Sequence, residues 1–307
     1  MTTKPRVLLD PALPGFLREP LSAVYETLPR PCSESDQPCV RAMVLPGSAG
    51  VSEAELDAHP ALEIIAMFAV GYDGIPLDAC RARGIRVTNT PDVLTEDVAD
   101  TALALTLMTS RELAAADKFV RKGRWLNEAF PLTRSVNGKR VGIVGLGRIG
   151  KAIAHRLEAC GMRIAYHGRH AQPDVSFEYF DSLTEMAKAS DFLVAACPGG
   201  AETRHLINAA VLDALGPEGT LINISRGSVV DETALVEAIH SQTLGGAGLD
   251  VFEDEPRVPE ALIESDRVVL LPHVGSATQE TRGEMARLCL ENLAAHFSGE
   301  PLKTPVC

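Results

Sequence analysis

The chain has 307 residues, of which 46% are hydrophobic and 23% are charged, and its formal net charge at pH 7 is −12. This length and composition predict a globular protein with one large domain or two medium ones. The acidic balance argues against nucleic acid and anionic membranes as partners, although a local cation can still bind a small anionic molecule. The longest apolar runs are too short to span a bilayer.

The seven cysteines are odd in number, and none of them forms C-x-x-C spacing. This usage predicts reduced thiols in the cytoplasm rather than a disulfide framework or a zinc site, and we expect no metal. The first residues lead directly into a predicted strand, so we expect no signal peptide.

Short apolar runs alternate with helical or turn segments through the first hundred residues. Prolines and glycines separate these runs, which predict strands at residues 6–9, 42–45, 63–68 and 86–88. Short strands between helices favour a parallel sheet. A long helix is predicted next, at about residues 96–122, and its apolar first half indicates a core helix or an interface.

The alternation becomes regular after residue 140. Six strands are predicted, at residues 140–144, 163–167, 191–196, 220–224, 247–251 and 267–271. Ser182 with Glu185 forms a capping box for one of the helices between them. A last long helix is predicted at about residues 278–297. This order predicts a second, doubly wound sheet and a terminal helix that returns to the first unit.

A glycine-rich turn lies between the first of these strands and a helix predicted at residues 148–160. Residues 141–150 read VGIVGLGRIG, in which Gly145, Gly147 and Gly150 have the G-x-G-x-x-G spacing of a dinucleotide site. The first glycine permits a tight turn. The second lets the backbone approach a pyrophosphate at the helix N-terminus, and the third lets helix and strand pack closely. The alternative is a glycine turn with a purely structural role.

The residue after the second strand of such a domain selects between NAD and NADP. Domains that bind NAD usually carry an Asp or Glu there, which binds the ribose 2′-hydroxyl. This chain has Gly168 followed by Arg169. The glycine removes a carboxylate that would repel a 2′-phosphate, and the guanidinium can bind the phosphate. We therefore predict NADP(H) in preference to NAD(H), with a solvated surface role for Arg169 as the alternative.

Three further stretches follow predicted strands of the second sheet, where ligands of doubly wound sheets bind. They carry Arg226, the pair Glu253 and Glu255, and His273. Reduction of a 2-oxo acid needs such groups. A guanidinium pairs with the carboxylate and polarises the ketone, an imidazole donates the proton, and a carboxylate orients the imidazole and favours its charged form. Each residue alone has a structural alternative, and only the set indicates catalysis.

Five stretches of the chain also form a recognisable set. They are residues 69–73 (AVGYD), 84–100 (GIRVTNTPDVLTEDVAD), 138–150 (GKRVGIVGLGRIG), 248–253 (GLDVFE) and 271–276 (LPHVGS). On these stretches the chain resembles the D-isomer-specific 2-hydroxyacid dehydrogenase family over essentially its whole length. Within the family it is most similar to the NADP(H)-linked glyoxylate/hydroxypyruvate and hydroxyphenylpyruvate reductases.

The resemblance implies an α/β fold with two doubly wound parallel-sheet domains and a cleft between them. A flavodoxin-like substrate-binding and catalytic domain is expected at residues 1–99 with 282–307, and a Rossmann dinucleotide-binding domain at residues 100–281. The resemblance also implies that Arg226, Glu255 and His273 are the catalytic trio, with Glu255 rather than Glu253 in the family position.

Binding residues follow from the same resemblance. The backbone amides of Val70 and Gly71, together with Arg226, match the site for the substrate carboxylate. The implied cofactor-binding residues are Gly145, Gly147, Arg148, Ile149, Gly150, Gly168, Arg169, Cys197, Pro198, Thr203, Ile224, Asp250, His273 and Gly275. Asp250 matches a residue near the nicotinamide amide.

The implied function is NADPH-dependent reduction of glyoxylate, hydroxypyruvate or related small 2-oxo acids to D-2-hydroxy acids, by a cytoplasmic homodimer. Trp125, the only tryptophan, lies where relatives reach a partner's active site, although a packing role is as reasonable. One alternative is a reductase of bulkier 2-oxo acids, such as hydroxyphenylpyruvate or 2-ketogluconate. Another is a dinucleotide-sensing, corepressor-like binding protein. A phosphoglycerate dehydrogenase is disfavoured because the sequence continues only briefly past the last helix.

Overall fold

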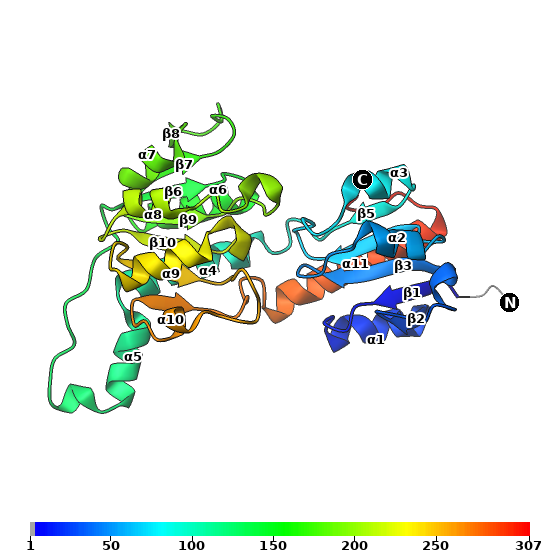
Figure 1. Ribbon diagram of the computed structural model, residues 1–307, viewed down its shortest axis with the longest axis horizontal. Helices are drawn as coiled ribbons and strands as arrows, with labels where there is room; N and C mark the ends of the chain where they lie inside the picture. Colours follow the sequence, from blue (N-terminus) through cyan, green and yellow to red (C-terminus); the bar gives the residue numbers. More distant parts are fainter. Residues whose placement is uncertain (1–3) are drawn as a thin grey trace. The chain divides into compact units, whose positions relative to one another are not determined.

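Five parallel strands form the sheet of the first unit in the computed structural model, which describes residues 4–307. The strands are β1 (Arg6–Leu9), β2 (Glu26–Pro29), β3 (Val40–Pro46), β4 (Ile64–Phe68) and β5 (Arg86–Thr88). Their spatial order is β2-β1-β3-β4-β5, and every neighbouring pair is parallel (Figure 1). This is the flavodoxin-like order, in which the chain direction across the sheet reverses beside β1.

Helices connect these strands, and a helix from the end of the chain completes the unit. They are α1 (Gly15–Val24), the 3₁₀ turn η1 (Gln37–Cys39), α2 (Glu53–Ala58), α3 (Leu77–Ala82) and α11 (Gln279–Ser298). The Thr278 hydroxyl caps the first turn of α11, which ends at Gly299 with φ +72°. Helix α11 packs against β4, and the segment after it forms an antiparallel bridge between Pro305 and Thr88.

Seven parallel strands form the sheet of the second unit. They are β6 (Arg140–Val144), β7 (Arg163–His167), β8 (Glu178–Phe180), β9 (Phe192–Ala195), β10 (Thr220–Asn223), β11 (Gly246–Leu249) and β12 (Val268–Leu270). The order β12-β11-β10-β9-β6-β7-β8 is that of a Rossmann sheet with one further strand at its edge. The reversal of strand order falls between β6 and β9.

The helices of the second unit begin with α4 (Thr95–Ser110), α5 (Leu113–Arg121) and the 3₁₀ turn η2 (Arg124–Leu126). The others are α6 (Arg148–Ala159), α7 (Leu183–Lys188), η3 (Ala201–Thr203), α8 (Ala209–Leu215), η4 (Gly227–Val229), α9 (Glu232–His240) and α10 (Glu260–Ile263). Ser182, Asn208 and Asp231 each accept a hydrogen bond from the amide three residues later and so cap a helix. Between the helices and the sheet lies a core of buried aliphatic side chains.

The structure confirms the predicted fold class, with two doubly wound parallel sheets, and corrects details of it. The predicted helix at 96–122 is two helices, because Glu112 takes a left-handed conformation with φ +49°. Strands β2 and β8 were not predicted. Both are short edge strands with half-exposed residues, so they lack the apolar run that marks the inner strands.

The chain divides into its two units after Leu94 and again after Ala277. The sequence interpretation placed these divisions a few residues later; α4 and α11 start at the observed points, with Thr278 as the cap of α11. Within residues 4–307, no helix combines the length and apolarity that crossing a bilayer requires.

Candidate active site

Strand β6 ends in a glycine turn that runs directly into α6. Gly145 has φ +93°, and a Cβ on it would lie 2.7 Å from Cα of Cys197, in the loop after the neighbouring strand β9. A Cβ on Gly150 would collide with the carbonyl oxygen of Gly145. At Gly147, by contrast, no atom lies within 4 Å of the Cβ position. The backbone at Gly147, beside the N-terminus of α6, is therefore open to the approach of an anion.

The carboxyl end of β7 leads into Gly168 and Arg169. No atom lies within 4 Å of the Cβ position of Gly168, and the Arg169 side chain is exposed. The hydroxyl of Tyr179, on β8, donates to the carbonyl of Gly168 at 3.2 Å and ties this turn to the sheet edge. The turn therefore combines open space at Gly168 with the exposed guanidinium of Arg169.

Other predicted cofactor residues lie on the same edge of the sheet. Arg148 and Ile149 occupy the first turn of α6. After β9, the Thr203 hydroxyl donates to the carbonyl of Pro198 at 2.7 Å and closes the loop. Burial raises the pKa of the Cys197 thiol to about 11, so this side chain is a neutral packing group. Ile224 is buried directly after β10.

Arg226, Glu255 and His273 lie in the loops after β10, β11 and β12, which are adjacent strands. Because the strands are parallel, the three loops emerge at one edge of the sheet. Gly227 lets two of the loops touch, since a Cβ there would collide with the backbone of Phe252. The structure thus brings the predicted trio onto neighbouring loops.

The imidazole of His273 binds the carboxylate of Glu255, with 2.7 Å between Nδ1 and Oε2. The other carboxylate oxygen accepts from the backbone amide of Phe252 at 3.1 Å. Burial acts to raise the pKa of Glu255, but the hydrogen bond and charge of His273, the Phe252 amide and the charge of Arg226 outweigh it and lower the pKa below its ordinary value. The carboxylate is therefore ionised, so Nδ1 donates and Nε2 is the position at which the ring exchanges a proton.

Glu253 has different partners and is not the partner of His273. Its Oε1 lies 2.7 Å from Nη2 of Arg204 and 3.0 Å from Nε2 of His205. Of the two carboxylates considered from the sequence, the structure therefore pairs Glu255 with the imidazole.

The loop that carries Arg226 is held by the buried side chain of Asn223. Its Oδ1 accepts from the amide and hydroxyl of Ser225 at 3.1 and 3.0 Å, and its Nδ2 donates to the carbonyl of Arg226 at 3.0 Å. Sequence reasoning gave Asn223 no role. The signal was an Asn at the end of a buried strand, where its amide can satisfy the loop backbone.

Asp250 holds the backbone next to His273. Its two carboxylate oxygens accept from the amides of Val274 and Gly275 at 2.7 and 2.8 Å, and its carbonyl accepts from the amide of His273 at 2.9 Å. These contacts fix His273 in a left-handed conformation with φ +54°. Burial raises the pKa of Asp250, partly offset by the two amides.

Val70 and Gly71 belong to the first unit, in the loop that follows β4. The start of the loop is held by backbone and side-chain hydrogen bonds from residues 89–90. Its far end is held at Gly74, whose carbonyl accepts from the amide of Val51 at 3.0 Å. A Cβ on Gly74 would lie 2.9 Å from Cα of Gly50, so the loops after β3 and β4 touch through glycine.

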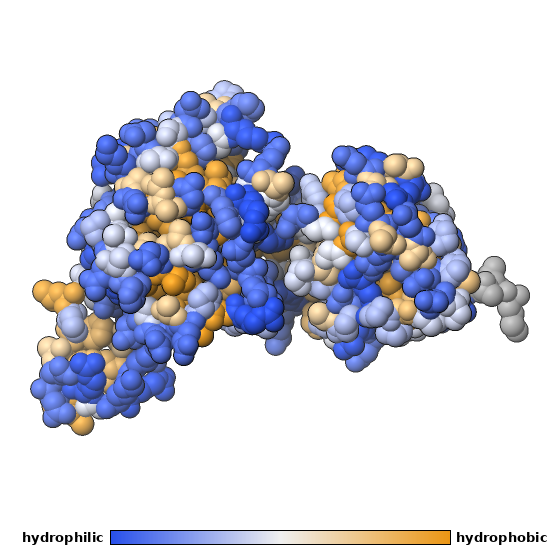
Figure 2. All heavy atoms as spheres, in the orientation of Figure 1, coloured by the Kyte–Doolittle hydropathy of each residue, from blue (hydrophilic) through white to orange (hydrophobic). Residues whose placement is uncertain are grey.

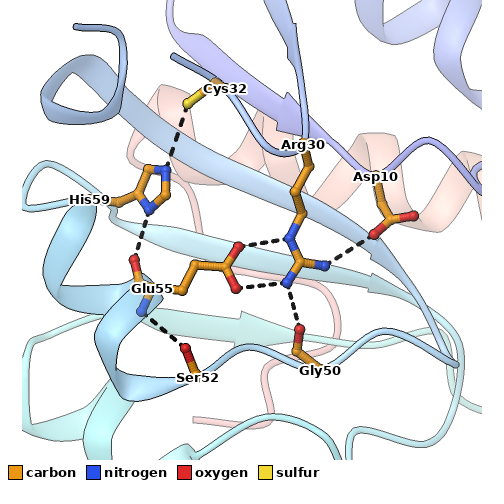
Figure 3. Close-up of polar contacts among 7 residues, drawn as sticks. All are labelled: Asp10, Arg30, Cys32, Gly50, Ser52, Glu55 and His59. Carbon is orange, nitrogen blue, oxygen red and sulfur yellow. Dashed lines mark hydrogen bonds and ion pairs between the residues drawn. The ribbon is translucent and has the colours of Figure 1, made fainter. Parts of the chain in front are cut away.

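The guanidinium of Arg30 also holds the loop after β3, through Gly50 and Glu55 (Figure 3). It donates to both carboxylate oxygens of Glu55, each at 2.7 Å, to Asp10 at 3.0 Å and to the carbonyl of Gly50 at 2.6 Å. Asp10 follows β1 and Arg30 follows β2. One side chain therefore joins the carboxyl ends of three strands, which fills the point where the strand order reverses.

Comparison with known proteins identifies the family. The model for the D-isomer specific 2-hydroxyacid dehydrogenase NAD-binding domain matches residues 103–275. Hydroxyphenylpyruvate reductase of Plectranthus scutellarioides is 54% identical over 87% of this chain and 85% of its own length. Glyoxylate/hydroxypyruvate reductase A of Arabidopsis thaliana is 52% identical over 89% and 87%.

A solved structure agrees with these relatives. It is that of the NADPH-dependent glyoxylate/hydroxypyruvate reductase of Sinorhizobium meliloti in complex with NADP and malonate. The two sequences are 48% identical, and the two structures superpose with a TM-score of 0.94. The match covers 99% of this chain and 97% of the Sinorhizobium chain. The chain therefore belongs to the D-isomer specific 2-hydroxyacid dehydrogenase family.

Proposed function

We propose that this protein is an NADPH-dependent reductase of small 2-oxo acids, such as glyoxylate and hydroxypyruvate, and that it forms D-2-hydroxy acids. The observation that carries this proposal is the hydrogen bond between His273 and Glu255, which lie on the loops after β12 and β11, beside the loop after β10 that carries Arg226. Reduction of a ketone by a dinucleotide requires a proton donor held in a fixed orientation and a cation near the carbonyl group. Both groups are present here, at the edge of the sheet where dinucleotides bind in Rossmann domains. Relatives named as glyoxylate/hydroxypyruvate reductases support it.

In this proposal each residue has a distinct task. The amides of Val70 and Gly71, with the guanidinium of Arg226, bind the substrate carboxylate, and Arg226 also polarises the ketone. The reduced nicotinamide supplies the hydride that attacks the carbonyl carbon. His273 gives the proton on Nε2 to the carbonyl oxygen and keeps the proton on Nδ1, which Glu255 holds in place. The first unit is thus the substrate domain, and the second is the dinucleotide domain.

A substrate panel tests this proposal. Purified protein is assayed with NADPH and with NADH against glyoxylate, hydroxypyruvate, hydroxyphenylpyruvate and 2-ketogluconate. The expected result is reduction of the two small acids with NADPH. A preference for hydroxyphenylpyruvate, the substrate in the name of one relative, would favour the bulkier alternative. Failure to reduce any of the four would contradict the proposed function.

We propose that the cofactor is NADP(H) in preference to NAD(H). Support comes from the open space at Gly168 and the exposed guanidinium of Arg169, and from the relative solved with NADP. A carboxylate at position 168 meets no steric obstacle, yet it repels a 2′-phosphate and can bind the 2′-hydroxyl of NAD.

The double variant Gly168→Asp with Arg169→Ala should therefore move the ratio of kcat/KM for NADPH to that for NADH towards NADH. The expected shift is about 10- to 100-fold, the worth of one or two charged hydrogen bonds. Arg163→Ala is the matched control, because Arg163 is exposed at the opposite end of β7. An unchanged ratio in the double variant would refute the role of this turn.

We also propose that the protein is a cytoplasmic homodimer. In Figure 1, α5 and η2 extend away from the sheet of the second unit. This segment exposes the apolar side chains of Leu113, Val120, Trp125 and Leu126, and Figure 2 shows hydrophobic residues among hydrophilic ones on it. Several large exposed apolar side chains on one protruding segment are typical of an interface between copies. Sedimentation at the mass of a monomer would contradict the dimer, and cell fractionation tests the location.

A further inference from the structure

Two consecutive peptide groups of the loop after β4 are held by their carbonyl oxygens. The carbonyl of Ala69 accepts from the backbone amide of Thr90 at 2.8 Å. The carbonyl of Val70 accepts from Nδ2 of the Asn89 side chain at 2.8 Å. Both donors follow β5, the neighbouring strand of the same sheet.

These carbonyl contacts determine where the amides of the loop point. A trans peptide is planar, so its C=O and N–H groups face in opposite directions. The N–H of Val70 lies in the same plane as the carbonyl of Ala69, and the N–H of Gly71 lies in the same plane as the carbonyl of Val70. Both N–H groups therefore point away from residues 89–90. Within residues 4–307, neither donates to another backbone carbonyl.

The backbone of Asn89 is held by a chain of hydrogen bonds from α11 and the segment after it. Asn89 is buried, and its backbone carbonyl accepts from the Thr304 hydroxyl at 2.6 Å. That hydroxyl in turn accepts from Nδ2 of Asn292, on α11, at 2.8 Å. The Oδ1 of Asn292 accepts from the amides of Lys303 and Thr304 at 2.9 and 3.1 Å. This partly buried network holds the backbone from which the Asn89 side chain reaches the Val70 carbonyl.

We propose that Asn89 is a positioning residue for the substrate carboxylate, and that Thr304 and Asn292 keep it in register. The inference rests on the proposed function, in which the amides of Val70 and Gly71 bind that carboxylate. Asn89 does not touch the substrate. It holds one peptide plane so that the N–H of Gly71 faces the ligand without reorganisation, which is the condition for strong binding of an anion by backbone amides.

Replacement of Asn89 tests this proposal. Asn89→Ala removes the donor to the Val70 carbonyl, so the N–H of Gly71 is no longer held toward the substrate carboxylate. We expect KM for glyoxylate to rise about tenfold or more, the effect of losing one charge-assisted hydrogen bond between an amide and a carboxylate. The inhibition constant of oxalate, a non-reacting dicarboxylate, should rise in parallel. Asn89→Asp should have a larger effect, because a carboxylate cannot donate to the Val70 carbonyl and repels it. KM for NADPH should stay near the wild-type value in both variants.

A second pair of variants tests the network without altering Asn89. Thr304→Val removes the hydroxyl and should raise both KM for glyoxylate and the inhibition constant of oxalate, by a smaller factor than Asn89→Ala. Thr304→Ser keeps a hydroxyl and should leave both constants near the wild-type values. These variants serve if Asn89→Ala fails to fold. The matched control is Asn208→Ala, which removes a helix cap in the second unit and should lower the Tm without changing KM for glyoxylate.

The outcomes separate this inference from the proposed function. If the wild-type protein reduces glyoxylate and Asn89→Ala leaves KM and the oxalate constant unchanged, the inference is overturned and the proposed function stands. Parallel loss of glyoxylate and NADPH affinity would also overturn it, because that result indicates general damage. If the wild-type protein reduces no 2-oxo acid, both are overturned.

Discussion

The variant His273→Gln is expected to lower kcat for 2-oxo acid reduction by about 10²- to 10⁴-fold, the range for loss of a general acid. Glutamine can still donate a hydrogen bond to the ionised Glu255, but its amide is too weak an acid to protonate a ketone oxygen. Substrate and NADPH do not depend on this proton for binding, so both KM values should stay near those of the wild type. Steady-state kinetics with each substrate varied in turn measures the three constants.

Two further variants show whether the loss of kcat comes from the missing acid or from another effect of the substitution. His273→Asn also removes the acid, and Asn tolerates the left-handed φ of +54° at this position well. A similar loss in both variants excludes backbone strain as the cause. His240→Gln, at an exposed position at the end of α9, is the matched control and should leave kcat unchanged. Turnover near the wild-type rate in His273→Gln would remove His273 from the proposed mechanism.

The variant Arg226→Lys is expected to lower kcat/KM for glyoxylate by about 10²- to 10³-fold, the range for loss of one preorganised donor at a developing oxyanion. A lysine keeps the positive charge but not the fork of N–H groups that reaches the carboxylate and the ketone together. Because the charge remains, Glu255 should stay ionised and its pair with His273 intact. The loss should therefore come from substrate geometry alone.

Arg81→Lys provides the control for this substitution, because Arg81 forms an exposed ion pair with Asp78 on α3. It should have near wild-type kinetics. The affinity for NADPH, measured by fluorescence, should be similar in Arg226→Lys and the wild type. If Arg226→Lys keeps most of its kcat/KM, the bidentate role of the guanidinium is wrong.

Much of the second unit was predictable because its signals are local. The glycine turn, the helix caps and the apolar inner strands each depend on residues within about ten positions, and the order of elements then implies a parallel sheet. The catalytic loops follow from the same rule, since residues after adjacent parallel strands meet at one edge. Selecting Glu255 over Glu253 required the resemblance, because both follow the same strand.

The features that sequence reasoning missed depend on distant contacts or lack a local signal. Asn89 is one residue of a stretch that matches the family, and the role proposed for it depends on contacts with Val70 and Thr304, which are 19 and 215 positions away. The break at Glu112 has neither Gly nor Pro to mark it, so a continuous helix was the reasonable expectation. The edge strand β2 owes its place to pairing with β1 rather than to its own composition.

The return of α11 to the first sheet has a consequence for how the protein is made. All five strands of that sheet lie within residues 6–88, but the helix that packs on β4 and the segment that pairs with β5 are translated only after the whole of residues 95–277. On the ribosome, the second unit can therefore reach its final packing while the first still exposes apolar surface. The first unit is therefore completed by a segment that is synthesised after the whole of the second.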